Sequence, residues 1–530
     1  MKRWYVPVIL AAMLVAGCGE GPSEQANPLS LVPDNAMIVV TLNDPAGVVR
    51  NIDGYIEDGA PILGANMLEN LVCEQLAIPS LDSMTARYGF DPSGIVVFWM
   101  ENAMPNSMGM AVSAPDLPLF LSLMEEMGAQ LTDEEPVKGN PVYSIDTGDG
   151  TVYITGSGGV AIMTMAQTKL EPLIDRLSDQ GGEVLPTSLT MQFNLAMIGP
   201  MVAGQMPMAR TMMLQGLAED PTMPEFVPGL MNVYLDGIEL VLTQADVATV
   251  TMTIGPEDFS VTKDLVFLEG SELAGMMVSP GGRDMLELIP AGDVATVRFR
   301  MPEEISIGII QAFTEVFSPG AESENLQFWA GMSSNAAVAM YDDTPMHLVA
   351  AYNLEEDVTL EQIAVMYSEY MDSFSSAFQS IGEIGEFFEI ADNGIVQYEG
   401  ADFYYMSMAI EVDTLTSMNF DYWMTIHNGA LLLEMAEEPS LLLDVISGDF
   451  IPAALTGTGD IAGEMSLAGY LGMIMAFSPN GMDLPEINSD VIIRWDGGFG
   501  DGGMHTVMTL NGRDALATGF AFFGLLSATM

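Results

Sequence analysis

Basic residues are scarce in this sequence. Lysine and arginine together number 14 of 530 residues, against 73 aspartates and glutamates, and the formal net charge at pH 7 is −59. Binding to a nucleic-acid backbone needs clustered cations, so this balance excludes nucleic acid as a main partner. So acidic a surface repels itself, and we expect diffuse association with divalent cations. Two explanations stay open: adaptation to a saline exterior, or a docking face for a basic protein partner.

Cysteine and histidine are also rare, with two and three copies. These numbers exclude disulfide frameworks and zinc fingers. His347, His427 and His505 are far apart, and no His-Glu-x-x-His motif occurs, so we expect strand or turn histidines and no metal cofactor. Cys73 follows Leu71-Val72 and is expected to be a small buried hydrophobe.

Catalytic and calcium-binding motifs are missing or misplaced. No Gly-x-Ser-x-Gly elbow occurs, and the Ser-x-x-Lys at 260–263 lies in an alternating pattern that places Ser260 and Lys263 on opposite strand faces. The acidic loops 146–150 and 496–503 do not fit the EF-hand pattern, and we interpret 496–503 as a wide hairpin loop. The sequence therefore predicts a protein without enzymatic activity and without cofactors. A hydrolase with a hidden site is the weakest alternative.

The N-terminus carries an export signal. Lys2 and Arg3 precede an apolar stretch, 4–15, that is too short for a comfortable membrane span. The stretch runs into Leu14-Val15-Ala16-Gly17-Cys18, which resembles the lipobox of bacterial lipoproteins. The resemblance implies a signal peptide over 1–17, acylation of Cys18, and a lipidated tether over 18–27.

The lipobox resemblance also implies a location. Acyl chains on Cys18 would hold the protein on a lipid bilayer, so the expected location is the bacterial cell envelope. Gly19, in the place where Asp would retain a lipoprotein at the inner membrane, favours the outer membrane.

The second half of the sequence repeats the first in outline. Residues 31–40, LVPDNAMIVV, return at 288–297 as LIPAGDVATV, and Pro45 and Pro302 follow at the same offset. Each proline is expected to open a helix, with Asp44 as the N-cap of the first. Matching predicted strands are 95–98 and 337–340, 108–112 and 347–351, 159–163 and 429–433, and 189–195 and 461–467. Matching predicted helices are 117–127 and 360–371, and 170–177 and 441–446; each half then closes with a hairpin and a helix, at 248–268 and 273–278, and at 491–510 and 515–527.

This order predicts two homologous domains, 28–280 and 283–530, joined near 280–282, with an additional hairpin in the second near 381–421. Strands follow strands more often than they alternate with helices. We therefore expect an α+β fold, in which each domain is a mainly antiparallel sheet with helices packed on one face.

Local signals support these elements. Thr168 to Glu171 and Thr359 to Gln362 match the capping-box pattern at helix starts. Asn-Gly pairs at 393–394, 428–429 and 511–512 favour tight hairpin turns.

Two short motifs carry a second resemblance. Val32-Pro33-Asp34-Asn35-Ala36 and the helix start Asp44-Pro45 resemble the openings of large uncharacterised bacterial envelope proteins of a domain-of-unknown-function family. That resemblance implies a fold and no activity.

Methionine is abundant, with 44 copies, and nine of them lie between Met191 and Met231. Pro200, Pro207 and Arg210 interrupt this segment, so it is no membrane span. Three interpretations stay open: core filling, an adaptable apolar cavity, and Cu(I) binding by thioethers. The sequence thus favours a membrane-anchored envelope lipoprotein with a non-enzymatic binding or structural role. The alternative is a carrier or chaperone for lipid or another hydrophobic ligand.

Overall fold

The structure is a computed structural model of the chain. It describes residues 26–59, 65–75, 78–148, 150–177, 186–218, 227–317, 331–342, 347–354, 358–379, 388–413, 416–476 and 491–514. The signal peptide, Cys18, most of the tether and the helix expected at 515–527 lie outside these residues.

Contacts between Cα atoms divide the chain into two compact units. Unit 1 combines the chain up to Ile198 with Val247–Asp264 and the chain from Thr509 onward. Unit 2 combines Gly199–Asp246 with Leu265–Met508. This division does not fall at 280–282, because helix α9 (Val227–Gln244) of the first half of the sequence contacts helix α11 (Glu303–Phe317) of the second half within unit 2.

Most of strands β1 to β10 belong to unit 1. Their pairings give the spatial order β10-β9-β8-β1-β2-β3-β7-β6-β5-β4, and every pair with a resolved register is antiparallel. The strands are β1 (Ile38–Asn43), β2 (Ile95–Met100), β3 (Met108–Ser113), β4 (Leu131–Val137), β5 (Asn140–Asp146), β6 (Thr151–Ser157), β7 (Val160–Thr164), β8 (Ser188–Asn194), β9 (Ala245–Ile254) and β10 (Asp258–Phe267).

Strands β11 to β19 and most of β20 belong to unit 2. Their order is β20-β19-β18-β11-β12-β13-β17-β16-β15-β14, again antiparallel wherever a register is resolved. The strands are β11 (Ala295–Arg300), β12 (Asn335–Tyr341), β13 (His347–Asn353), β14 (Phe388–Tyr398), β15 (Ala401–Asp413), β16 (Thr416–His427), β17 (Ala430–Met435), β18 (Ile461–Ser466), β19 (Ile492–Gly500) and β20 (Gly503–Asn511).

The two strand orders are the same when ten is added to each label of unit 1. Strands β14 to β16 therefore stand where β4 to β6 stand in unit 1. They are longer than these counterparts, and the structure does not single out a hairpin near 381–421 as additional.

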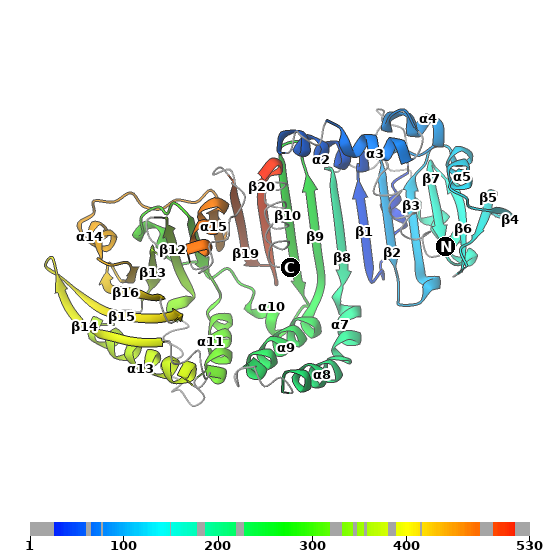
Figure 1. Cartoon of the computed structure of the whole chain (residues 1–530). Helices are drawn as coiled ribbons and strands as arrows, with labels where there is room; N and C mark the ends of the chain where they lie inside the picture. The colour runs from blue at the N-terminus through cyan, green and yellow to red at the C-terminus, as the bar shows by residue number, and fades with distance from the viewer. Residues whose placement is uncertain are drawn as a thin grey trace. The chain divides into compact units, whose positions relative to one another are not determined.

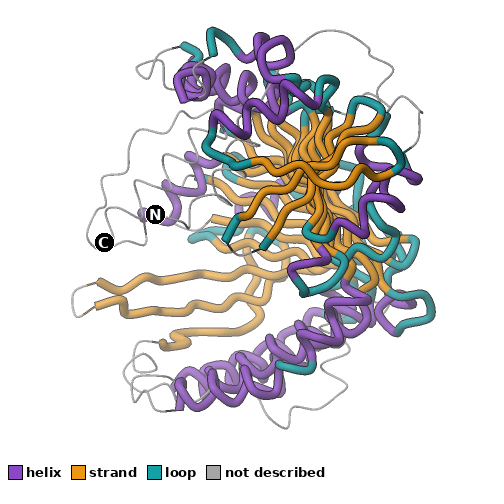
Figure 2. Tube along the Cα trace, turned by 90° about the vertical axis from the view of Figure 1, so that its right-hand side faces the viewer, coloured by secondary structure: helices purple, strands orange, loops and turns teal. Residues whose placement is uncertain are grey.

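The helices flank the sheets, as the tube trace shows (Figure 2). In unit 1 they are η1 (Pro28–Leu31), α2 (Pro45–Gly59), α3 (Met67–Gln75), η3 (Leu81–Ser83), α4 (Met84–Tyr88), η4 (Pro105–Ser107), α5 (Leu117–Glu126), η5 (Gln167–Lys169) and α6 (Leu170–Arg176). α7 (Leu195–Ala203) crosses the unit boundary. In unit 2 they are α8 (Met206–Ala218), α9 (Val227–Gln244), α10 (Glu272–Met276), η6 (Met285–Leu288), α11 (Glu303–Phe317), α13 (Leu360–Gln379), α14 (Ser440–Ser447) and α15 (Leu467–Ala476).

The chain is thus α+β with antiparallel sheet, as expected, but helices cover both faces of each sheet. In unit 1, α2 to α5 pack on one face, while η1 and α6 pack on the other. In unit 2, α13 covers one face and η6 and α14 the other. Every residue of β7 and of β17 is buried, so apolar side chains on both faces need cover. The expectation of helices on one face was therefore wrong.

Turn and capping signals had mixed outcomes. The Asn-Gly pair at 428–429 forms the predicted turn, with φ of 50° and 75°. The pair at 393–394 lies inside β14, and the turn that joins β14 to β15 uses Glu399 and Gly400 instead. In the pair at 511–512, Asn511 is the last residue of β20, and the pair joins no hairpin among the described residues.

Of the predicted helix caps, some are present in the structure and one is not. The backbone N–H of Gly47 donates to Asp44 Oδ1 at 2.9 Å, so Asp44 caps the helix that Pro45 opens. The capping box at Thr359 and Gln362 is present in both directions, with N···O distances of 2.9 and 3.4 Å. Thr168 forms no such cap, because the 3-10 turn η5 already places it in helical backbone.

Candidate functional site

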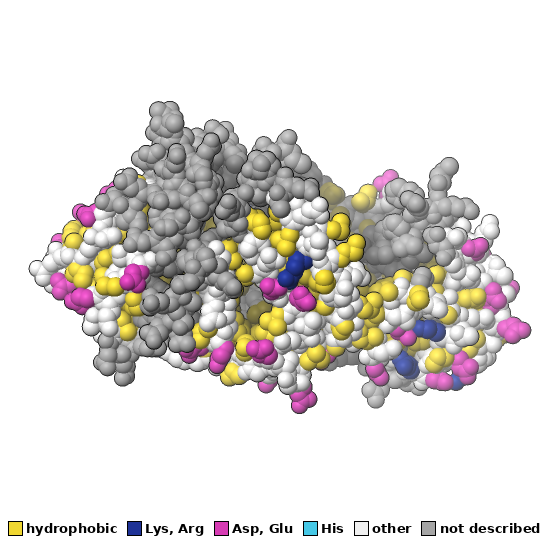
Figure 3. Space-filling model, turned by 90° about the horizontal axis from the view of Figure 1, so that it is seen from below, with side chains coloured by type: hydrophobic (Ala, Val, Ile, Leu, Met, Phe, Trp, Pro, Cys, Tyr) yellow, Lys and Arg dark blue, Asp and Glu magenta, His cyan; other side chains and the backbone are white. Residues whose placement is uncertain are grey.

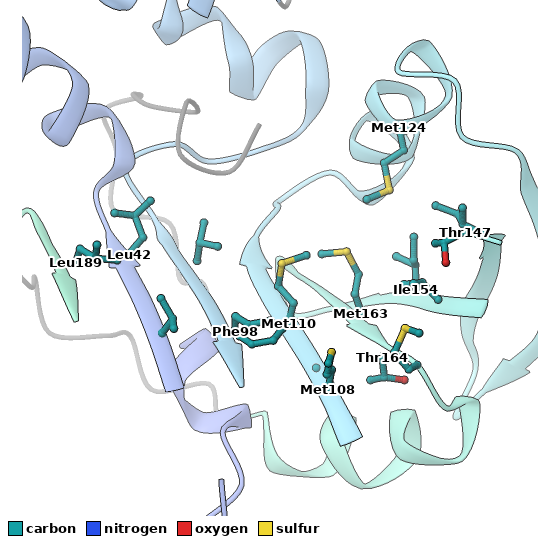
Figure 4. Close-up of a pocket in the computed structure, with 16 residues that line it drawn as sticks. Leu42, Phe98, Met108, Met110, Met124, Thr147, Ile154, Met163, Thr164 and Leu189 are labelled. Carbon is teal, nitrogen blue, oxygen red and sulfur yellow. The ribbon is translucent and has the colours of Figure 1, made fainter. Parts of the chain in front are cut away.

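A pocket of about 410 Å³ lies in unit 1 and is lined almost wholly by apolar side chains. The lining comes from β1, β2, β3, β5, β6, β7, β8 and α5, and five of its side chains are methionines (Figure 4). The lining residues are Val40, Leu42, Val96, Phe98, Met108, Gly109, Met110, Met124, Ile145, Thr147, Val152, Ile154, Met163, Thr164, Met165 and Leu189.

Strand register builds the floor of the pocket. Val40 pairs with Phe98, Phe98 with Met110, Met110 with Met163, and Met163 with Ile154. Paired residues of antiparallel strands point to the same face, so these side chains form one apolar row across the sheet. In Figure 4, Met110 and Met163 point into the same space as Met124, which comes from helix α5.

Helices α2, α3 and α5 pack on this face of the sheet. In Figure 1, α2 and α3 lie across one end of strands β1 and β2, and the chain enters α2 directly after β1. Helix α5 has only 10 residues and spans about 15 Å, and it contributes Met124 alone to the pocket lining.

Unit 2 has a covered counterpart of the same row. Successive pairs link Val297, Val338, Ala350, Leu433 and Met424. Helix α13, with 20 residues and a length of about 30 Å, packs on this face. Ile363 and Met371 of α13 are buried against it. Both rows are buried at one end, at Ile154 and Met163 in unit 1 and at Met424 and Leu433 in unit 2, and half-buried at Val40 and Val297.

Among the described residues that line the pocket, Thr147 and Thr164 have the polar side chains, and both hydroxyls are engaged. Thr147 donates to the carbonyl of Gly150 at 2.8 Å, and Thr164 donates to the carbonyl of Ala166 at 2.7 Å. Each hydroxyl has one hydrogen, so neither can donate to a ligand without giving up its bond. The pocket offers apolar surface and no charged group.

The three histidines lie where strand or turn residues were expected. His347 begins β13, His427 ends β16, and His505 lies in β20. In the described part of the chain, no three His, Cys, Asp or Glu side chains gather as a metal site would require.

The buried pair of His347 and Glu434 is structural. His347 Nε2 lies 3.0 Å from Glu434 Oε1, and both side chains are buried. The carboxylate also accepts the backbone N–H of Leu442 at 2.9 Å and that of Leu441 at 3.3 Å, which caps the first turn of α14. No local pattern predicts this cap, because Glu434 lies on strand β17 and not directly before the helix.

The remaining candidates are also accounted for by structure. Ser260 and Lys263 lie in strand β10. The segment 496–503 is not the wide loop that was expected: β19 runs to Gly500, and Asp501 and Gly502 alone make the turn. Asp496 accepts the backbone N–H of Gly459 at 2.6 Å, so it holds the chain rather than an ion.

Cys73 is buried in the core of unit 1, as expected. Burial, and secondly the charge of Glu69, raise the pKa of its thiol above the usual value. A thiol in this state is a poor nucleophile.

The Met191 to Met231 segment does not form the cavity. Its described methionines lie on β8 and helices α7 to α9, and several are exposed, among them Met201, Met208, Met212 and Met213; Met223 lies outside the described residues. Apolar side chains reach the surface on the side seen in Figure 3. No helix among the described residues is long and apolar enough to span a membrane.

The pocket methionines were not singled out from the sequence. Met108 and Met110 alternate along β3, a pattern that places both on one face, and this was the available signal.

Comparisons with known proteins add little. No family model matches the chain, and no curated protein matches it. Among solved structures, crystal form IV of TP0453 gives a TM-score of 0.25 at 9% identity, over 46% of this chain and 81% of that one. Crystal form III of TP0453 gives 0.26 at 10% identity, over 47% and 83%. Similarity at this level supports no inference of a shared fold or function.

Proposed function

We propose that the protein binds a hydrophobic ligand in the pocket of unit 1 and acts as a carrier or chaperone for it. The observation that carries this proposal is the apolar pocket built on the row from Val40 to Ile154, which the sheet floors and whose described lining residues include no charged group. Methionine side chains adapt to ligands of different shape, which suits a pocket with five of them. The proposal describes a non-enzymatic activity and needs no cofactor.

Binding of the uncharged dye Nile red, followed by its fluorescence, tests the proposal. The full chain carrying Cys18→Ser should bind the dye, and Met110→Trp should weaken binding about tenfold, because loss of about 60 Å² of contact is worth about 1.5 kcal/mol. Met104→Trp is the matched control, since Met104 is 65% exposed and lies outside the pocket. Equal binding by both variants would place the dye elsewhere and refute the proposal.

We also propose that the protein is anchored in the bacterial cell envelope, at the outer membrane, by acylation of Cys18. The lipobox sequence supports this, and a carrier of apolar ligands benefits from residence beside a bilayer. Cys18→Ser should release the protein from the membrane fraction or leave the precursor unprocessed. Unchanged processing and membrane retention would contradict the anchor.

We further propose that the chain arose by tandem duplication of one α+β unit. The shared strand order of β1 to β10 and β11 to β20 supports this, as does the repeated 31–40 segment. In that view one copy keeps a ligand pocket on its sheet face, and the other covers that face with α13. Ile363→Ala changes the α13 face and leaves the pocket of unit 1 as it is. The full chain with this substitution should therefore bind Nile red as tightly as the chain without it.

A further inference from the structure

We propose that the pocket selects an uncharged long-chain ligand, such as an alcohol or a monoacylglycerol, over a long-chain anion of the same length. This inference rests on the proposed function, because it names the class of ligand that the pocket would take. Three features of the structure carry it: the described lining residues offer no free hydrogen-bond donor, basic residues of unit 1 are held in ion pairs, and acidic side chains lie beside the pocket.

The lining contains nothing that would bind an anionic headgroup. Lysine and arginine are absent from it, and the hydroxyls of Thr147 and Thr164 already donate to backbone carbonyls. The floor strands β1, β2, β3, β6 and β7 each pair with a neighbour on both sides, so their backbone N–H groups are largely taken up by the sheet. A carboxylate drawn into this pocket would lose its hydration without compensation, which is costly.

Three basic residues of unit 1 form ion pairs with acids. Lys169 pairs with Glu101, and Lys138 pairs with Asp175. Arg50 lies 2.7 Å from Asp82 and 3.7 Å from Glu69. None of these cations can turn to a ligand headgroup without leaving a partner.

Acidic side chains stand beside the lining residues. Glu125 and Glu126 directly follow Met124 on α5, and Asp146 directly precedes Thr147; all three are exposed. With a net charge of −59 over the chain, the field around the pocket repels anions and does not affect neutral ligands.

The counterpart in unit 2 supports the same chemistry. The face that corresponds to the pocket is covered by uncharged side chains of α13, including Ile363, Tyr367 and Met371. The ring of Tyr367 meets that of Tyr404 edge-on, with centroids 6.2 Å apart.

Displacement of Nile red by 1-decanol and by sodium decanoate tests the inference. The two compounds share a chain length, and decanoate is ionised at pH 7.5. Using the full chain carrying Cys18→Ser, we expect decanol to displace the dye at about one tenth of the decanoate concentration at 0.01 M salt. The two concentrations should lie closer together at 0.1 M salt, because the Debye length falls from about 30 Å at 0.01 M to about 10 Å at 0.1 M.

A charge variant sharpens the test. Met108→Lys places an ammonium group at a partly exposed lining position and should lower the concentration of decanoate needed, relative to decanol. Met104→Lys adds the same charge at an exposed position outside the pocket and should leave the ratio nearly unchanged. Circular dichroism of each variant checks that it is folded.

The outcomes separate the two proposals. If decanoate displaces the dye as well as decanol at low salt, the selectivity is wrong while the pocket stands. If Nile red does not bind, or Met110→Trp leaves its binding unchanged, the pocket itself is wrong. If Met104→Lys changes the ratio as much as Met108→Lys, the discrimination is a property of the whole surface and the pocket does not select.

Discussion

Tyr55 joins helix α2 to the turn between β9 and β10. Its hydroxyl lies within hydrogen-bond distance of the carbonyls of Gly255 and Asp258, the latter at 2.9 Å, and its ring is buried. Burial, and secondly the charge of Asp258, raise the pKa of Tyr55 to about 12. A raised pKa means that the folded state favours the neutral phenol. The stability this provides is complete below the unfolded value of about 10, and it is lost as the pH rises toward 12.

Tyr55→Phe should therefore destabilise the protein by about 1 kcal/mol at pH 7, because a hydrogen bond to a buried carbonyl is lost. The difference in unfolding free energy between Tyr55→Phe and the original protein should shrink between pH 10 and pH 12. In that range Tyr55 ionises when the protein unfolds, and the phenylalanine of the variant cannot. Urea unfolding at pH 7 and at pH 10.5 measures both. A difference that grows with pH would contradict the assignment.

Cys73 provides a second test at this scale. Because burial raises its thiol pKa, the folded chain carrying Cys18→Ser should react with Ellman's reagent far more slowly at pH 8 than the same chain in urea. Fast reaction in the folded state would show that α3 opens or that the thiol is accessible.

Among elements, the capping box at Thr359 and its missing counterpart at Thr168 form a natural pair. Thr359→Ala should cost about 1 kcal/mol, because it removes the acceptor for the N–H of Gln362 at the start of α13. Thr168→Ala should be nearly neutral, because Thr168 is exposed and caps no helix. Thermal unfolding of the two variants compares them directly, and equal losses would refute the difference in capping.

Elements were predicted well from the sequence where a strand alternates or a helix has a start signal. Helix α5 begins at Leu117 and α13 at Leu360, both as expected. The end of α13 could not be predicted, since the apolar pattern weakens after Met371 while the helix continues to Gln379. The pocket was missed because it depends on which strands and helices the fold brings together, a tertiary property that local patterns do not encode.

At the scale of the whole molecule, the acidic surface governs stability. Added sodium chloride between 0.01 and 0.1 M should raise the melting temperature, because screening weakens repulsion among carboxylates. Magnesium and calcium at millimolar concentration should raise it further and nearly equally, since Asp496 is engaged by the chain. A melting temperature that is flat in sodium chloride and rises with calcium alone would instead indicate a specific site.

The positions of the few basic residues also determine where trypsin-like proteases can cut the chain. Trypsin-like enzymes cut after lysine or arginine, and no such residue occurs between Arg300 and Arg494. Both of these arginines lie in strands, and each has a carboxylate of Asp460 or Glu464 within 4.0 Å of its guanidinium. Cleavage needs an extended, accessible segment, which paired strands do not offer. No tryptic cut can fall inside residues 301–494, so this segment should persist as one long fragment in any environment where proteolysis is tryptic.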